Sequence, residues 1–339
     1  IKALKGVIWQ AGLGTVYEKV MRLEELAKFV NKYIGADEKL LLRAAKLCKT
    51  DLVTSMIKDG KEYTDLQGFI ASFYAKEDGE PDEVVRAIYE HRLPISADDE
   101  LPKTKSGIVL SIADRIDNLL GASLLNILPT GTKDPMGIRR QLNGLFLILI
   151  AHKIHMNLRK VIEFSANLYK KPLDIDKTYE FLKQRLRSFL IESGERHDLV
   201  DSVLKFDDVY DIKLRLSALH ECANLGKFSE LATLAKRIYN MLKGQAYGKF
   251  DEKLLVEKEE KKLYEKGKEL ESIVIPLIES KQYVKALMNL LELSTYIHEF
   301  FDRVFVMVDD LKLRNNRLAL LGNLKILFEK FADFSKVRE

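Results

Sequence analysis

The sequence has few cysteines, no long hydrophobic run and no strong charge of either sign, and each of these absences excludes a class of protein or of binding site. Its two cysteines, Cys48 and Cys222, lie inside apolar helical patterns, which predicts buried thiols and excludes a disulfide framework or a cysteine zinc site. The longest apolar run, Leu145 to Ala151, is far too short to span a membrane. The net charge of +4 is a mild bias toward polyanions, so a nucleic-acid site requires local clusters of Lys and Arg.

Strand-like alternation is also scarce, and the seven prolines fall mainly at breaks between helical patterns. Apolar residues recur at spacings of three and four almost throughout, as in 16–30 and 318–331. We therefore predict an all-α protein. Ile1 stands where a start methionine would, which predicts a portion of a longer chain.

The most highly charged stretch, 252–271, carries seven acidic and six basic residues among twenty. One interpretation is a protruding helical arm that meets a partner. The interpretation that we favour is a helix with a solvated face on which Glu and Lys pair at a spacing of four.

Three aspartates lie beside apolar helical faces and predict a polar cluster inside a helical bundle. Asp51 continues the apolar spacing of Ala44 and Leu47, and Asp114 and Asp117 share one stripe of a later helix. Carboxylates at the edge of a buried face require partners, and a metal ion is the first partner to test.

The metal site of helical HD-type phosphohydrolases offers a template, but its imidazoles are missing here. Those enzymes hold a divalent metal through a His, an adjacent His-Asp pair and a distant Asp, whereas this chain has Thr50 before Asp51 and no histidine before His91. Carboxylates alone are a poor site for a transition metal. We therefore predict a degenerate HD-like pocket, without metal and without hydrolase chemistry, formed by Asp51, Asp114, Asp117 and His91.

Structural roles explain these polar residues without a metal. The acids are expected to bond to helix ends or to basic neighbours such as Arg115 and Arg86, and His91 is expected to cap a helix end before a proline. A second histidine pair, His152 and His155, lacks the Glu of a zinc-protease helix. No catalytic residue and no metal ligand is predicted in the chain.

Several blocks resemble, in order and spacing, the β subunit of the bacterial heterotetrameric glycyl-tRNA synthetase. They are the stretch from Ala44 to Pro94, "SIADRIDNLLG" and above all "PTGTKDPMGIRRQLNG". Further on, "LRLSALHECANLGKFSELATLAKRIYNML" and the stretch from Glu299 to Val337 are similar to the helical anticodon-binding domain shared with arginyl-tRNA synthetases. The resemblance covers essentially the whole chain and leaves out the family's N-terminal half, and only "KDGKEYTDLQG", 58–68, departs from the family pattern.

The resemblance implies a degenerate HD-like helical domain over 1–151, connecting helices over 152–205 and a helical-bundle anticodon-binding domain over 206–339. It also implies the tRNA-binding part of a cytoplasmic glycine–tRNA ligase, which uses ATP to attach glycine to tRNA(Gly). In that family the α subunit carries the class II core. This portion is therefore expected to hold no cofactor and to be inactive alone.

The implied partners follow from the same resemblance. They are tRNA(Gly) and the glycyl-tRNA synthetase α subunit in an α2β2 assembly. The α subunit is expected to bind ATP and Mg²⁺. Neither a membrane nor DNA is expected as a partner. The alternative is an HD-type metal-dependent phosphohydrolase fused to an RNA-binding helical module.

Anticodon recognition requires cations that hold phosphates and flat groups that stack on or bond to unpaired bases. The favoured patch is Arg314 and Arg317 with Asn315 and Asn316 at a helix start, and a plain helix cap is the alternative. Further cationic candidates in the last region are Lys213, Arg215, Lys236, Arg237, Arg303 and Lys312. The nearby Phe300, Phe301 and Phe305 are expected to be mostly core.

The loop "PTGTKDPMGIRRQ" has two possible roles. In the first, the loop contacts the tRNA backbone or acceptor arm through Lys133, Arg139 and Arg140. In the second, Arg139 pairs with Asp114 or Asp117 and the loop is a structural clamp. We favour the clamp, because it explains the loop and the acid cluster with one arrangement.

Local signals in this loop predict its geometry. Gly131 permits a turn that is closed to other residues, and Pro135 is expected in the first turn of the following helix. Asp134 is expected to cap that helix.

Overall fold

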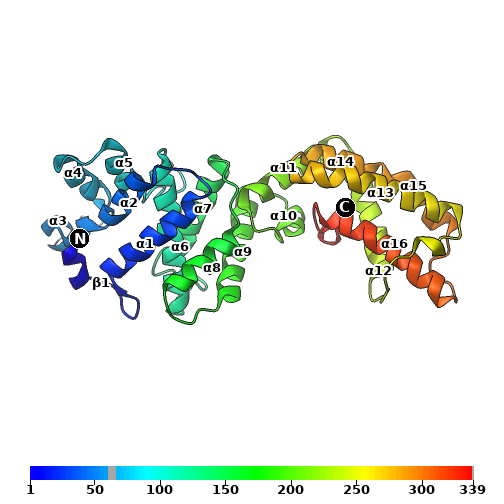
Figure 1. The fold of residues 1–339 in the computed structure, drawn as a ribbon, viewed down its shortest axis with the longest axis horizontal. Coiled ribbons are helices and arrows are strands. Elements are labelled where there is room, and N and C mark those ends of the chain that lie inside the picture. The colour runs from blue at the N-terminus through cyan, green and yellow to red at the C-terminus, as the bar shows by residue number, and fades with distance from the viewer. Residues whose placement is uncertain (60–65, 338–339) are drawn as a thin grey trace. The chain divides into compact units, whose positions relative to one another are not determined.

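The structure is a computed structural model, and it describes residues 1–59 and 66–337 (Figure 1). Part of the stretch that departs from the family pattern, 60–65, lies outside the described residues. The chain forms two compact units, which we call unit 1 and unit 2. Unit 1 contains Ile1–Phe189 and Asp207–Tyr210, and unit 2 contains Leu190–Phe206 and Asp211–Glu339.

Unit 1 is a helical bundle with one small hairpin at its N-terminal end. The antiparallel strands β1 (Ile8–Gln10) and β2 (Gly14–Thr15) follow the 3-10 helix η1 (Lys2–Gly6). The remaining elements of this unit are α1 (Val16–Asn31), α2 (Glu38–Leu47), η2 (Thr50–Val53), α3 (Ser55–Asp59), α4 (Phe69–Glu77), α5 (Asp82–Glu90), α6 (Lys105–Leu124), α7 (Ile138–Ala151), α8 (Leu158–Leu168) and most of α9 (Ile175–Glu192).

Helix α6 lies at the centre of unit 1. It packs against α1, α2, α5, α7 and α8 (Figure 1). It is buried along almost its whole length. A Cβ at Gly121 would lie 2.6 Å from the Trp9 ring, so a glycine is required where β1 approaches α6. Polar side chains on a helix this deeply buried must be paired, which directs attention to Asp114 and Asp117.

Helix α1 begins where the sequence signals a start. Thr15 and Glu18 form a reciprocal capping box, in which each side chain accepts a hydrogen bond from the other residue's backbone N–H. The apolar face predicted over 16–30 faces the core, because Val16, Val20 and Leu23 are fully buried. The cap and the apolar stripe together fix which face of α1 points toward α6.

Unit 2 is a second helical bundle. Its elements are the end of α9, α10 (His197–Val203), most of α11 (Val209–Asn224), α12 (Phe228–Leu242), η4 (Glu252–Leu254), α13 (Lys258–Glu279), α14 (Tyr283–Leu291), α15 (Leu293–Arg303), α16 (Leu311–Glu329) and η5 (Phe334–Lys336). Helix α13 packs against α14, α15 and α16, and α12 packs against α16.

The prediction of an all-α protein is confirmed, since the only β-sheet in the described residues is the two-stranded hairpin. Cys48 and Cys222 are buried and free, as predicted. None of the described helices is long and apolar enough to cross a membrane. The division into 1–151, 152–205 and 206–339 stays a prediction, and in the structure the helices of 152–189 belong to unit 1.

The highly charged stretch is integrated into unit 2 and forms η4 and the first half of α13. Glu260, Leu263, Gly267 and Leu270 are buried, so the protruding-arm interpretation is wrong. The exposed face is charged, as predicted, but several of its pairs reach another element. Lys266 bonds to Glu292 at 2.7 Å and Lys262 bonds to Glu299 at 3.2 Å, which ties α13 to α15 and the residue before it.

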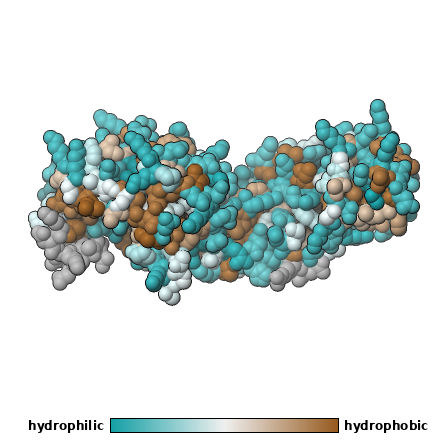
Figure 2. Space-filling view, turned by 90° about the horizontal axis from the view of Figure 1, so that it is seen from below, coloured by the Kyte–Doolittle hydropathy of each residue, from teal (hydrophilic) through white to brown (hydrophobic). Residues whose placement is uncertain are grey.

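On the face drawn in Figure 2, the surface of each unit is mainly hydrophilic. Hydrophobic residues on this face form separate patches between hydrophilic ones. Scattered exposed apolar residues are normal for a folded protein. An exposed aromatic therefore requires an explanation only where cations or other flat groups lie beside it.

Candidate functional site

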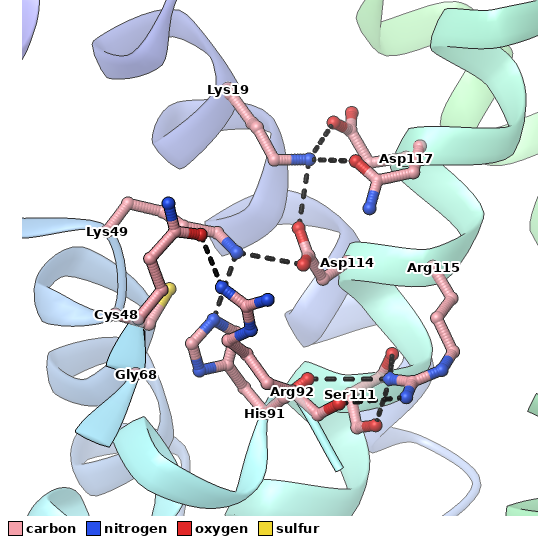
Figure 3. A network of polar contacts seen from close by, with 12 residues as sticks. Lys19, Cys48, Lys49, Gly68, His91, Arg92, Ser111, Asp114, Arg115 and Asp117 are labelled. Atoms are coloured by element: carbon pink, nitrogen blue, oxygen red, sulfur yellow. Dashed lines mark hydrogen bonds and ion pairs between the residues drawn. The ribbon is translucent and has the colours of Figure 1, made fainter. Parts of the chain in front are cut away.

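Two lysines occupy the acid cluster of unit 1 (Figure 3). Lys19 on α1 points at α6, where its ammonium lies 2.9 Å from Asp114 Oδ1 and 2.8 Å from Asp117 Oδ2. The side-chain oxygen of Asn118 accepts a further hydrogen bond from Lys19 at 2.8 Å. Arg22, one turn further along α1, donates to Asp117 at 2.8 Å. Helix α1 thus neutralises both carboxylates of α6.

The second lysine, Lys49, reaches the same cluster from the segment that follows α2. Its ammonium donates to Asp114 Oδ2 at 2.8 Å and lies 2.9 Å from Nε2 of His91. Because an ammonium can only donate, His91 Nε2 accepts, and Nδ1–H donates to the carbonyl of Ile88. His91 also ends α5, so the prediction that it caps a helix end is confirmed.

The pairing sets the charge of each group. Burial alone would raise the pKa of Asp114, but Lys19 and Lys49 hold it well below the usual range. Burial lowers the pKa of Lys19, and the two carboxylates outweigh that effect, so its pKa is raised. Burial and then the charge of Lys49 lower the pKa of His91 well below its ordinary value. At neutral pH Lys19, Asp114 and Asp117 are therefore charged, and the imidazole of His91 is neutral.

Asp51 lines one cavity together with Lys19, Lys49 and Asp114, but its carboxylate has a different kind of partner. Its carboxylate accepts a hydrogen bond from the backbone N–H of Gly68, the residue before α4, at 2.6 Å. Burial raises the pKa of Asp51, and this N–H opposes the rise. The expectation that an acid bonds to a helix end is therefore confirmed for Asp51.

The expected basic partners were wrong, because Arg115 and Arg86 take no part in the cluster. The guanidinium of Arg115 donates to backbone carbonyls, among them that of Pro94 at 2.8 Å and that of Ser111 at 3.1 Å. Figure 3 shows it turned toward Ser111 and away from Lys49. Lys19, Lys49 and Arg22 were missed because lysines and arginines on amphipathic helices are usually solvated, although Lys19 lies between Val16 and Val20 on the apolar stripe of α1.

The geometry does not fit a divalent metal. Both oxygens of Asp114 and one of Asp117 face a lysine ammonium, so the cationic position of an HD-type site is filled by the chain itself. Within the described residues no three His, Cys, Asp or Glu side chains are grouped to hold a metal ion. His155, one member of the second histidine pair, lies 2.8 Å from Asp208.

The loop before α7 holds itself together. Asp134 accepts hydrogen bonds from the backbone N–H groups of Ile138 at 2.8 Å and Arg139 at 3.0 Å, so the predicted cap is confirmed. Gly131 has a φ of +52°, as expected for its turn. Helix α7 begins at Ile138, so Pro135 precedes the first helical turn and that expectation was wrong.

The favoured clamp was also wrong. Arg139 donates to the carbonyl of Gly131 at 2.7 Å, while Asp114 and Asp117 are paired with Lys19, Lys49 and Arg22. Lys133 and Arg140 are exposed. The loop thus presents two cations to solvent and uses the third, Arg139, to brace its own turn.

The favoured patch at the start of α16 divides into inward and outward residues. Arg317 is buried, pairs with the buried Glu260 of α13, and donates to the carbonyl of Phe305 at 2.8 Å. The buried Asn316 exchanges two hydrogen bonds with the backbone of Asp251. Arg314 is half-buried and Asn315 is exposed. For Arg317 and Asn316 the structure favours the structural alternative.

The remaining cationic candidates of unit 2 also divide into two groups. Lys213 pairs with Glu195 at 2.6 Å, and the buried Arg215 pairs with Asp211 at 2.6 Å. Arg303 and Lys312 are exposed, and Lys236 is half-buried. Lys213 and Arg215 are therefore part of the scaffold.

Arg237 lies at a hollow of unit 2 that exposes flat and polar groups. The hollow is lined by Arg237, Asn240, Met241, Gln245, Phe301 and Met307, and we call it the Arg237 surface. The Arg237 guanidinium carbon lies 4.7 Å from the centre of the Phe301 ring, and Nη1 lies 2.6 Å from Nδ1 of His298. A guanidinium over a ring and amide side chains suit an unpaired base.

Phe305 was expected with the core phenylalanines, but its side chain is 78% exposed, whereas Phe300 is fully buried. The segment between α15 and α16 alternates, with Val304 and Val306 inward and Phe305 and Met307 outward. This period of two, within a helical sequence, is the signal that could have separated Phe305 from Phe300.

Comparisons with known proteins cover almost the whole chain. A family model described as "Glycyl-tRNA synthetase beta subunit" matches residues 1–205, and one described as "DALR anticodon binding domain" matches residues 231–334. Similar curated proteins are the glycine–tRNA ligase beta subunits of Sulfurihydrogenibium sp. (strain YO3AOP1), 37% identical over 99% of this chain, and of Clostridioides difficile (strain 630), 38% identical over 99%.

The same alignments cover 48% and 50% of those two relatives. The subunit from Coxiella burnetii (strain RSA 331 / Henzerling II) is 37% identical over 98% of this chain and 49% of its own length. The chain therefore spans about half the length of the curated relatives that it matches.

Proposed function

The chain belongs to the glycyl-tRNA synthetase β-subunit family, and from this we propose that it forms the tRNA-binding part of a glycine–tRNA ligase β subunit. The complete enzyme attaches glycine to tRNA(Gly) with ATP in the cytoplasm, as an α2β2 assembly whose α subunit binds ATP and Mg²⁺. This portion contributes tRNA binding and has no charging activity alone.

The observation that carries the proposal is the Arg237 surface, which lies within the stretch similar to an anticodon-binding domain. It combines a guanidinium, an aromatic ring and amide side chains. Phe305 lies two residues before Met307 in the chain and is exposed far more than packing requires. Stacking on such a ring favours unpaired bases of any sequence, and side-chain amides add base-edge recognition.

Arg317 is buried and holds the backbone of the segment that carries Phe305. By holding the Phe305 carbonyl while paired with Glu260, it fixes the backbone that turns Phe305 outward. We therefore propose that Arg317 is a positioning residue, whereas Arg237, Phe301 and Phe305 contact the RNA. Arg303, Lys312, Arg314 and Asn315 flank them in the chain and supply further contacts to phosphates or bases.

In unit 1 we propose Lys133 as a contact to a tRNA phosphate. It is exposed in a turn that Arg139 and Asp134 brace. The phosphohydrolase alternative is not supported, because Lys19 and Lys49 take the carboxylate oxygens that a catalytic metal would need. The bundle that resembles an HD domain then serves as a binding scaffold.

The test measures the affinity of the 339-residue chain for tRNA with a glycine anticodon and for the same tRNA with a changed anticodon, at two salt concentrations. We expect Phe305→Ala to weaken binding by about 1–3 kcal/mol, the usual worth of one stacked base, and to reduce the preference for the glycine anticodon. Phe73→Ala is the matched control, because Phe73 is 52% exposed in unit 1.

Equal losses in the Phe305 and Phe73 variants would contradict the placement of the anticodon site. Equal affinity of the unchanged protein for both tRNAs, at both salt concentrations, would show that this portion reads no anticodon. Charging assays with added α subunit, ATP and glycine then test whether the chain functions in the ligase reaction.

A further inference from the structure

The lysine-filled cluster forms part of the wall of a cavity in unit 1 with a volume of about 460 Å³. This volume is typical of sites for small molecules, which span about 300–1,000 Å³. The hairpin strand β1, helices α1 and α6, the segment after α2 and the loop before α7 all contribute to its lining. The tRNA contacts proposed above do not use this cavity.

Cations outnumber acids in the lining. The five cationic residues are Lys19, Lys49, Arg92, Arg115 and Arg140. Only Asp51 and Asp114 contribute carboxylates, and His91 is held neutral between Lys49 and the Ile88 carbonyl. Asp117 lies outside the lining and is matched by Arg22. The cavity therefore carries an excess of positive charge, which favours an anionic occupant over a metal cation.

Several of these cations have donors to spare. Lys49 has three N–H groups and uses two of them, toward His91 and Asp114. Arg92 donates to the side chain of Gln67 and has further N–H groups. Within the described residues, Arg140 has no hydrogen-bond or ion-pair partner. Spare donors on two guanidiniums and an ammonium are suited to a tetrahedral oxyanion.

We propose that this cavity binds the phosphate group of a phosphate monoester, such as a mononucleotide. Lys49, Arg92 and Arg140 hold the phosphate oxygens, and Lys19 keeps Asp114 from repelling them. The ring of Trp9 and the side chains of Ile95 and Met136 line the rest of the cavity and accept the less polar part of the ligand. A phosphate monoester supplies close to two negative charges at neutral pH, which a carboxylate does not.

The experiment uses Trp9, which is the only tryptophan of the chain and lines the cavity. Its fluorescence is followed while the 339-residue chain is titrated with inorganic phosphate, ribose 5-phosphate or AMP at constant ionic strength. Ribose and adenosine are the neutral probes. We expect a saturable change with the three phosphates and none with the neutral compounds.

The substitutions Arg92→Gln and Arg140→Gln each remove charged donors, and each is expected to weaken ribose 5-phosphate binding about tenfold or more. Arg86→Gln is the matched control, because Arg86 is exposed on α5 of the same unit and does not line the cavity. Thermal unfolding of each variant verifies that it is folded.

A linear response, or an equal response to sodium chloride, would overturn the proposal. Loss of affinity in Arg86→Gln equal to that in Arg140→Gln would overturn it as well. Displacement of ribose 5-phosphate by tRNA with a 5′-phosphate, but not by the same tRNA without it, identifies an RNA end as the source of the group. Binding unaffected by either tRNA identifies a free nucleotide, and both results support the site.

Discussion

His91 is an uncharged histidine held between the Lys49 ammonium and the backbone carbonyl of Ile88. Burial and the Lys49 charge keep its pKa well below the ordinary value, so its imidazole stays neutral while the same residue in the unfolded chain takes up a proton near pH 6.5. The unfolded state therefore binds more protons below that pH. By linkage, the folded state loses stability as the pH falls through this range.

At the residue scale we therefore expect the free energy of unfolding of unit 1 to fall between pH 6.5 and pH 5 by up to about 1.4 kcal/mol per pH unit. Urea unfolding followed by circular dichroism at several pH values measures it. The lowered pKa values of Asp114 and Asp117 act in a separate window, because their stabilisation is lost only below about pH 4.

In His91→Gln this slope should flatten, whereas in His197→Gln, at an exposed position, it should not. An unchanged slope in His91→Gln would mean that another group takes up the proton.

At the scale of elements, Arg317 joins three parts of unit 2. It lies on α16, pairs with Glu260 of α13 and holds the segment that presents Phe305. Glu260 in turn accepts hydrogen bonds from the backbone N–H groups of Val256 at 2.7 Å and Glu257 at 3.0 Å, at the start of α13. A change at Arg317 therefore leaves a buried carboxylate without its cation.

We expect Arg317→Ala to lower the free energy of unfolding of unit 2 by about 3–5 kcal/mol, the usual result of breaking a buried ion pair. Arg314→Ala, one turn away and half-buried, should change it by about 0.5 kcal/mol or less. Urea unfolding monitored by circular dichroism compares the two. A stable Arg317→Ala protein with reduced tRNA affinity would restore Arg317 as a direct RNA contact.

At the scale of the whole molecule, charge is nearly balanced, with 55 basic and 51 acidic residues, and ion pairs use many of the basic ones. Long-range attraction of tRNA is therefore modest, and affinity depends on the exposed cations that touch phosphates.

Each phosphate contact adds about one unit to the slope of log affinity against log salt. We expect Lys133→Gln to reduce this slope by about one, and Lys76→Gln, at an exposed position on α4 of the same unit, to leave it unchanged. Filter binding of tRNA between about 50 and 200 mM salt provides the measurement. Identical slopes for Lys133→Gln and the unchanged protein would exclude a phosphate contact at Lys133.

Periodicity predicted the helices well because the pattern is repeated over many residues. The apolar stripes of 16–30 and 318–331 are α1 and most of α16, and Asp134 follows the ordinary chemistry of helix starts. The pairing of charges was not predictable in this way. Lys19 bonds to Asp117, 98 residues further along the chain, and Lys49 bonds to Asp114, 65 residues further along. Both bonds form only after α1, α2 and α6 have packed.

Single residues with two possible environments were the other source of error. Arg314 and Arg317 each lie four residues before a leucine of the apolar stripe, and only the position of α13 places Arg317 in a core ion pair. Phe300 and Phe305 differ because α15 ends at Arg303 and the next residue, Val304, is extended. The end of that helix, not the residue type, decides which ring reaches solvent.

The lysines of unit 1 have a consequence for how this bundle depends on its surroundings. A metal ion bound between carboxylates can be removed by a chelator or exchanged for another ion, whereas an ammonium attached to α1 or to the segment after α2 cannot leave. The cations that pair with Asp114 are side chains of the same chain, Lys19 and Lys49. The pairing of Asp114 and Asp117 therefore needs no metal ion, and it depends on proton concentration instead.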